Sequence, residues 1–164
     1  MTRSHPRSPP LAMWVGLSAL ALAGCASQGT DTSLVPAPAP AALPASIQPD
    51  EVVGRWGLAA YHREADRPRT EANARGQCKQ PYVITKGPTG GVIMHLADQP
   101  QPEELRLKGG PGGKNYIGPE GPAADTRDRE VVLFTGRVMV LRWMDPEVAG
   151  PYGTSIYVRC GARA

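Results

Sequence analysis

The chain has 164 residues, and its 19 glycines and 18 prolines together occupy 37 positions. Residues that interrupt helices this often argue against long helices and coiled coils. The 18 Lys and Arg residues nearly balance the 15 Asp and Glu residues, which gives a net charge of +3. This balance excludes a nucleic-acid binder that relies on neutralising backbone phosphates. The length allows one modest domain together with a linker.

Residues 1–24 have the order of charge and hydropathy that is typical of an export signal. Arg3, His5 and Arg7 form a basic start, and residues 11–23 form an uncharged, mostly apolar run. This run is too short to span a bilayer, which needs about 20 apolar residues, but it suits the core of a signal peptide. Removal of residues 1–24 would leave 140 residues and a net charge of +1, because Arg3 and Arg7 carry the only formal charges among them.

The apolar run ends in Leu22-Ala23-Gly24-Cys25, which resembles the lipobox of bacterial lipoproteins. The resemblance implies cleavage between Gly24 and Cys25, followed by acylation of the Cys25 thiol and amine. Two or more acyl chains anchor a protein stably in a bilayer. Ala26 follows the cysteine where Asp would favour the inner membrane, so we expect the outer membrane of a Gram-negative bacterium, with the domain facing the periplasm. The alternative is an ordinary secretory peptide with an accidental cysteine.

Residues 25–49 are predicted to form a lipidated tether rich in Pro and Ala. The alternation of Pro36, Pro38 and Pro40 with alanine favours an extended polyproline II conformation that buries nothing. Such a segment would hold the domain away from the membrane. Binding to a proline-recognising partner is the alternative.

Residues 50–164 are predicted to form one mainly β domain. Short apolar or alternating segments predict strands at 52–58, 82–85, 92–96, 105–108, 131–134, 137–144 and 154–160. Residues 66–76 could form a short helix with Asp66 as N-cap and Gly76 as C-cap, or a loop. Residues 109–122 are expected to be a flexible surface loop in which only Tyr116 and Ile117 are candidates for ordered structure. Six to eight short strands with at most one short helix indicate a small antiparallel β-barrel or a sandwich.

Cys78 and Cys160 are the two cysteines that remain after Cys25 is assigned to lipid. An even pair in an exported domain favours a disulfide, which would join the last strand to the segment before the second one. Two free thiols or a metal pair are the alternatives, although two cysteines without clustered histidines make a poor zinc site. On the last strand, Ile156, Val158 and Cys160 are expected to share one face.

Gly54-Arg55-Trp56 is similar to the Gly-x-Trp of lipocalins and related small barrels, including periplasmic metalloprotease inhibitors. In lipocalins this Trp closes one end of the barrel and packs against an Arg near the last strand. The resemblance therefore implies barrel-end packing of Gly54, Trp56 and Arg159. The chain is shorter than secreted lipocalins and lacks an obvious terminal helix, so the barrel could be hollow or packed. The alternative for Trp56 is a plain core residue.

The candidate catalytic residues do not form a recognisable site. His62 and His95 have no nucleophile elbow or zinc-binding helix motif around them, and His95 is expected to face solvent. Glu103 and Glu104 would point to opposite faces of a strand. The glycine-rich segment 109–115 departs from the phosphate-binding loop at its first position and at its last. We therefore expect no enzyme activity, no metal and no other cofactor.

Together these patterns predict a lipoprotein of the outer membrane that acts as an envelope interaction or structural module. One alternative is a small-barrel protease inhibitor, in which a flexible N-terminal segment enters the protease cleft. Another is a carrier of an apolar ligand, which requires a cavity. The expected partners are the lipid bilayer, through acylated Cys25, and an envelope protein or a protease, but not nucleic acid. The basic residues within 63–79 indicate a solvated face, or else a weak contact with an anionic surface.

Overall fold

The computed structural model describes residues 42–161. The predicted signal peptide, Gly24, Cys25 and residues 26–41 of the predicted tether lie outside the described residues. The account that follows concerns the barrel domain.

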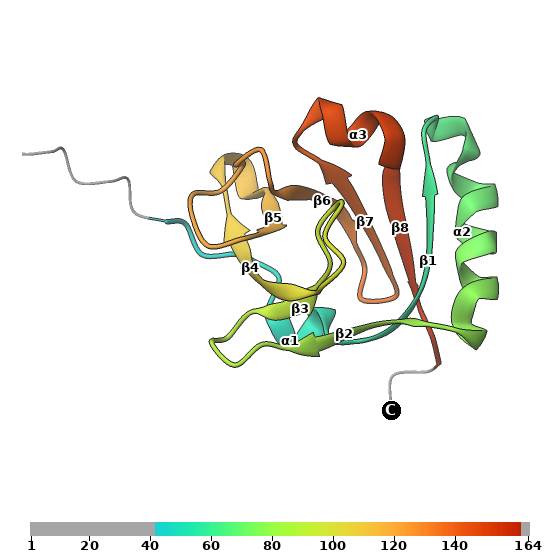
Figure 1. Ribbon diagram of the computed structural model, residues 1–164, viewed down its shortest axis with the longest axis horizontal. Coiled ribbons are helices and arrows are strands. Elements are labelled where there is room, and N and C mark those ends of the chain that lie inside the picture. The colour runs from blue at the N-terminus through green and yellow to red at the C-terminus, as the bar shows by residue number, and fades with distance from the viewer. Residues whose placement is uncertain (1–41, 162–164) are drawn as a thin grey trace, which may run out of the picture. The chain divides into compact units, whose positions relative to one another are not determined.

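Eight antiparallel strands form a closed barrel, in which each strand pairs with the next along the chain and β8 returns to β1 (Figure 1). The strands are β1 (Gly54–Tyr61), β2 (Tyr82–Lys86), β3 (Val92–Met94), β4 (Glu103–Gly109), β5 (Asn115–Gly118), β6 (Arg129–Phe134), β7 (Val138–Trp143) and β8 (Thr154–Arg159). The helices are α1 (Pro49–Val52), α2 (Arg67–Gly76) and α3 (Pro146–Tyr152), with 3-10 turns η1 (Glu64–Asp66), η2 (Gln77–Lys79) and η3 (Pro111–Gly113). The predicted mainly β class and antiparallel barrel are confirmed, and closure of the sheet decides against the sandwich.

Large apolar side chains fill the barrel interior. They alternate along the strands with outward-facing residues, as the two-residue period of a β-strand requires. The fully buried members of this cluster are Val52, Trp56, Val92, Met94, Leu105, Ile117, Met139 and Leu141. This filling by side chains is the packed form that small barrels of short strands can adopt.

Helix α2 lies along the outer side of β1 and β8 (Figure 1). A second apolar cluster lies between this helix and the strands. Ala74 of α2 packs there with Ile156 and Val158 of β8. The face that Ile156 and Val158 share is therefore the outer face, whereas Tyr157 points into the interior cluster. Both faces of β8 are buried because the barrel covers one of them and the helix covers the other.

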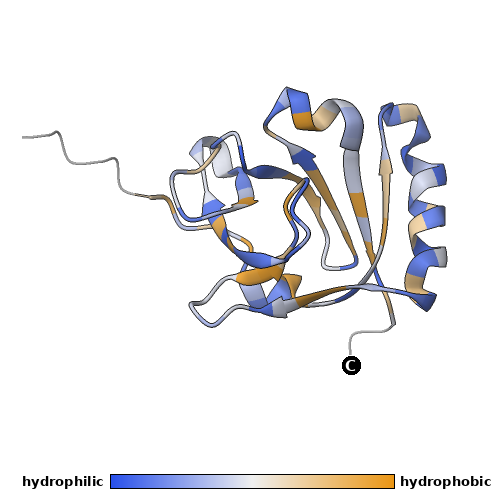
Figure 2. Ribbon diagram, viewed as in Figure 1, coloured by the Kyte–Doolittle hydropathy of each residue, from blue (hydrophilic) through white to orange (hydrophobic). Residues whose placement is uncertain are grey.

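Helix α2 is predominantly hydrophilic (Figure 2), and it docks through small residues. Thr70 and Ala74 are its buried positions. A Cβ atom on Gly57 of β1 would collide with the Ala74 carbonyl oxygen, so the glycine allows the helix backbone to approach the strand. Together with η1 and η2, α2 makes one continuous helical stretch over residues 64–79.

The ends of α2 differ in detail from those predicted. Asp66 occupies the N-cap position but caps no backbone N–H with its side chain. Its carboxylate instead accepts from Arg63 and Arg69, at 3.0 and 3.3 Å. The C-cap is Gln77 rather than Gly76, because the chain continues directly into η2.

Two further short helices lie where the sequence predicted none. Residue 52, predicted to begin the first strand, instead ends α1, because Pro49 at its N-terminus and a capping box between Gln48 and Glu51 favour a helical turn. At α3, Asp145 caps the helix by accepting a hydrogen bond from the Glu147 N–H at 2.8 Å. Sequence reasoning missed both helices because each is only one or two turns long.

The expected flexible loop at 109–122 contains strand β5, and the strand is entirely buried. Tyr116 and Ile117 pair with β4 on one side and β6 on the other. The flanking glycines and prolines concealed this strand in the sequence, since four residues are too few to show a period. The ordered pair that the sequence suggested, Tyr116 and Ile117, is the centre of this strand, and the expectation of a flexible loop was wrong for the flanking Asn115 and Gly118.

Residues 43–48, which the predicted tether included, lie against the barrel. Leu43 forms an isolated β-bridge with Gly109. The Ser46 N–H donates to the Asn115 Oδ1 at 2.8 Å, and the Asn115 Nδ2 donates to the Ser46 Oγ at 2.8 Å. Ile47 is 9% exposed and belongs to the interior cluster. These contacts extend the folded body N-terminally to Leu43.

Candidate functional site

Trp56 and Arg159 pack together at one end of the barrel. They lie opposite each other in the pairing of β1 with β8, and the Arg159 Cζ is 4.1 Å from the centroid of the Trp56 ring. The ring is fully buried, and its Nε1–H donates a hydrogen bond to the Val52 carbonyl oxygen at 2.9 Å. The structure thus brings together the two side chains that the Gly-x-Trp resemblance implied.

The Arg159 guanidinium also binds three backbone carbonyl groups from two parts of the chain. Its Nε donates to the Gly136 oxygen at 2.7 Å, and its Nη1 donates to the Val53 oxygen at 2.9 Å. Its Nη2 donates to the Glu51 oxygen. One side chain therefore joins the β6–β7 turn to α1 and to the start of β1.

Gly54 leaves room for this guanidinium. Its φ of 148° lies in the region that side-chain-bearing residues rarely adopt, and a Cβ atom there would collide with the Arg159 Nη1. Gly54 therefore leaves space for the Arg159 guanidinium, and the Trp56 ring stacks on that guanidinium.

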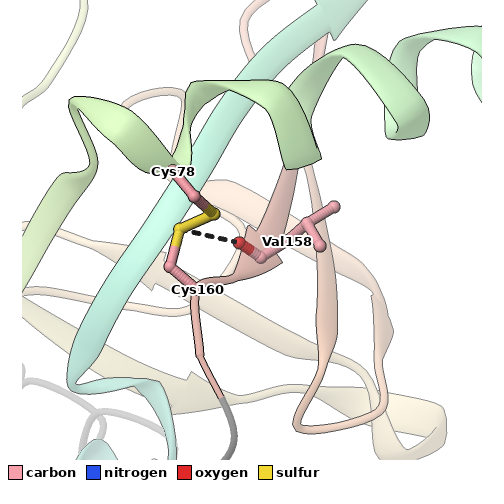
Figure 3. The surroundings of a disulfide bond; sticks show 3 residues. All are labelled: Cys78, Val158 and Cys160. Carbon is pink, nitrogen blue, oxygen red and sulfur yellow. Dashed lines mark hydrogen bonds between the residues drawn. A yellow bond between two sulfur atoms is a disulfide. The ribbon is translucent and has the colours of Figure 1, made fainter.

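The predicted disulfide between Cys78 and Cys160 is confirmed (Figure 3). It joins η2 to the residue that follows β8, with the two Cα atoms 5.5 Å apart. The Cys160 Sγ lies 3.9 Å from the Val158 carbonyl oxygen. The bridge fixes the C-terminal end of the helical stretch to the same barrel end that Arg159 closes.

A surface depression of about 680 Å³ lies beside this disulfide, between the end of α2 and the β6–β7 hairpin. Its lining comprises Arg75, Cys78, Thr135, Arg137, Val138, Val158, Arg159 and Gly161. Among the described residues that line it, three are arginines and none carries a carboxylate, so these side chains give the depression a positive charge. Arg75 pairs with Glu71 just outside it, and Arg137 is exposed.

Three other basic residues of the 63–79 segment, Arg63, Arg67 and Arg69, form local ion pairs. Arg67 pairs with Glu64 at 3.2 Å, and Arg63 and Arg69 share Asp66. Such exposed pairs neutralise the helix surface and contribute little to stability. The cationic surface beside the disulfide therefore depends on Arg137 and Arg159 as well as on Arg75.

Arg129 and Trp143 form a second buried polar group, which sequence reasoning missed. They are cross-strand partners on β6 and β7, and the Arg129 Cζ is 5.0 Å from the centroid of the Trp143 ring. Arg129 is 2% exposed. Two-residue alternation could have found it, because Arg129 shares a strand face with Val131, which packs on the interior cluster.

A row of aromatic side chains crosses the interior. The ring centroids of Trp56 and Tyr157 are 6.4 Å apart, and those of Tyr157 and Tyr82 are 5.8 Å apart. Burial raises the pKa of Tyr157 to about 12, although the nearby Arg129 guanidinium opposes this rise. Both tyrosines therefore remain neutral at physiological pH.

The candidate catalytic residues are not brought together in an active-site arrangement. His95 is exposed, as predicted, and its backbone N–H donates to the Tyr82 hydroxyl at 2.8 Å. His62 is exposed after β1.

Glu104 accepts hydrogen bonds from the Gly91 and Thr89 N–H groups at 2.7 and 3.0 Å. Desolvation opposes ionisation of Glu104, but these bonds hold its pKa below the usual range, so its carboxylate orders the turn between β2 and β3.

Within residues 42–161, no three His, Cys, Asp or Glu side chains are grouped as metal ligands would be. No helix in this range has the length and apolarity needed to cross a membrane. Comparison with models of protein families, with curated proteins and with solved structures found no match to this chain.

Proposed function

We propose that the protein is a lipid-anchored lipoprotein that acts as a non-enzymatic interaction module facing the periplasm. The anchor rests on the lipobox-like Leu22-Ala23-Gly24-Cys25 and on the apolar run before it. The module is the barrel, which the disulfide and the Arg159 contacts brace at one end. A rigid scaffold of this kind suits presentation of a surface rather than opening around a large ligand.

The observation that carries the interaction role is the cationic depression beside the disulfide. Arg75, Arg137 and Arg159 line it, and no carboxylate is among its described lining residues. The exposed Arg137 carries the argument, because Arg75 pairs with Glu71 and Arg159 binds backbone carbonyl groups. Complementary charge speeds encounter and discriminates between partners. We therefore propose that the depression docks an acidic segment of another envelope protein.

Two features favour this role over the alternatives. An inhibitor of the small-barrel type needs a free N-terminal segment, and the contacts of Leu43, Ser46 and Ile47 hold the last residues of that segment against the barrel. A carrier of a large apolar ligand needs an open interior, and side chains such as Trp56 and Met139 fill it. The bound N-terminal residues and the filled interior leave the depression beside the disulfide available for a partner.

In-cell cross-linking from the depression tests the docking role. With a photoreactive residue in place of the exposed Thr135, we expect a discrete adduct with an envelope protein. Arg137→Glu should reduce its yield about tenfold or more, because it places a negative charge against an acidic partner. Arg127→Glu is the matched control, since Arg127 is also exposed but does not line the depression. Equal adduct yields from the two variants would refute the proposed surface.

Substitution of the acylation site tests the anchor. Cys25→Ser should move the protein from the membrane to the soluble envelope fraction, because each buried acyl methylene contributes about 0.8 kcal/mol to anchoring. The Cys78→Ser/Cys160→Ser variant should stay in the membrane fraction, since the anchor needs only Cys25. A Cys25→Ser protein that remains membrane-bound, with unchanged gel mobility, would contradict the lipoprotein assignment.

A further inference from the structure

Arg129 carries buried hydrogen-bond donors that no described residue satisfies. Its Nε and Nη2 atoms are both inaccessible to solvent and lack a hydrogen-bond partner in the protein. The Trp143 Nε1, on the ring that Arg129 covers, is in the same state. Three donors without acceptors thus lie on two cross-strand neighbours at the same level of the barrel.

The charge of Arg129 is uncompensated, unlike the other buried charges nearby. Buried Asp128 has the Lys108 Nζ at 2.6 Å from its Oδ1. Glu130 pairs with Arg142 at 2.6 Å and with Lys114 at 3.1 Å. The described residues supply no carboxylate to Arg129. A buried guanidinium without a counter-charge is strongly disfavoured, so an acceptor from outside the protein would stabilise this one.

The donor arrangement selects the chemistry of that acceptor. The Nε–H and Nη2–H bonds of a guanidinium are parallel, and this fork matches the two oxygens of a carboxylate. The third donor, the Trp143 Nε1–H, adds a hydrogen bond for an anion but none for a cation. The filled interior leaves no described space for a long tail, so the complementary ligand is small.

Tyr152 covers this site from α3. Its ring centroid lies 6.2 Å from that of Trp143, and its hydroxyl donates to the Asp98 carboxylate in the β3–β4 loop. The Tyr152 side chain is partly exposed, and Asp98 has a φ of 57°. Tyr152 is thus an exposed side chain that packs beside the Trp143 ring.

We propose that Arg129 and Trp143 form a binding site for a small carboxylate anion beneath Tyr152. The guanidinium fork holds the two carboxylate oxygens, and the indole N–H donates to one of them. The proposed docking of an envelope partner does not depend on this site, because the two use different residues.

Sodium acetate titration of the full chain, followed by 1H–15N correlation spectra, tests the proposal. Ionic strength is held constant with sodium chloride, and Trp143→Phe assigns the Trp143 indole signal. We expect this signal to shift saturably, with half-saturation at about 1 mM. The Trp56 indole is an internal control in the same sample, because its N–H already donates to Val52 and should not shift.

Substitution of Arg129 completes the test. Arg129→Met should abolish the acetate response, and Arg129→Lys, which keeps the charge but loses the fork, should weaken it at least about tenfold. An unchanged Trp56 signal would show that each variant is folded. Absence of a saturable Trp143 shift in the unsubstituted chain would overturn the proposal whatever the variants do. So would equal shifts of both indoles, or saturation by sodium sulfate but not by acetate.

Discussion

Single side chains determine how the barrel end is closed, and Arg159 is the main example. It stacks on Trp56 and donates hydrogen bonds to three carbonyl oxygens, one in the β6–β7 turn and two at the end of α1. Each of these acceptors is a backbone group, which would lose its partner if the side chain were shortened. These hydrogen bonds contribute more to folding stability than an exposed ion pair does, because they are partly buried and charge-assisted.

We expect Arg159→Met to lower the free energy of unfolding by about 3 kcal/mol, from the lost charge-assisted hydrogen bonds and the lost cation–π contact. Urea unfolding followed by Trp56 fluorescence would measure this loss. Arg55→Met is the matched control, because Arg55 is an exposed arginine on the neighbouring strand β1, and it should change stability by less than about 0.5 kcal/mol. Similar losses for both variants would show that Arg159 has no special role.

At the scale of elements, helix α2 depends on close backbone approach more than on an apolar face. Its residues are mostly polar, and only Thr70 and Ala74 are buried. The absence of a side chain at Gly57 lets the Ala74 carbonyl lie directly against β1. The disulfide then holds the end of the helical stretch in place.

Two glycine substitutions separate this packing effect from helix propensity. Gly57→Ala should lower the unfolding free energy by about 2 kcal/mol, because the added methyl group forces α2 away from β1. Gly76→Ala should raise it by about 0.5–1 kcal/mol, since Gly76 has helical φ and ψ and no atom near its missing Cβ. Thermal unfolding of the two variants would show whether Gly57→Ala destabilises the protein and Gly76→Ala stabilises it. An unchanged unfolding free energy in Gly57→Ala would contradict the close contact between Gly57 and the Ala74 carbonyl group.

At the scale of the molecule, the disulfide links segments that are 82 residues apart in sequence. It ties the last strand to the segment before β2, and β8 in turn closes the barrel on β1. The bridge therefore reinforces closure of the barrel, and it does so in the oxidising compartment that the proposed export would provide.

We expect reduction of Cys78–Cys160 to lower the unfolding free energy by about 4.5 kcal/mol, from the chain entropy that the unfolded protein regains. Urea unfolding with and without a reductant, at matched pH, would measure the difference. The Cys78→Ala/Cys160→Ala variant should unfold alike in both conditions. If the reductant lowered the unfolding free energy of this variant as much as that of the unsubstituted protein, the loss would not come from the disulfide.

The sequence predicted much of the barrel because its signals are local. Seven of the strands carry alternating or apolar runs, and the even cysteine pair indicated the disulfide. Strand β5 was missed because four residues between glycines show no period, although its neighbours bury it. Arg129 was missed because the predicted strand began at residue 131, two residues after the start of β6, and because arginine is normally assigned to solvent.

The sequence by itself determined the mainly β class, the positions of seven strands and the Gly54-Arg55-Trp56 signal at the barrel end, because periodicity, turn residues and motif spacing are local properties. The tertiary structure decided which face of β8 lies under α2, which carbonyl groups Arg159 binds, and that Arg129 is buried without a counter-charge. These depend on closure of the sheet, which places residues far apart in sequence within contact distance. Burial and charge compensation are properties of that assembled interior, and no segment of the chain specifies them alone.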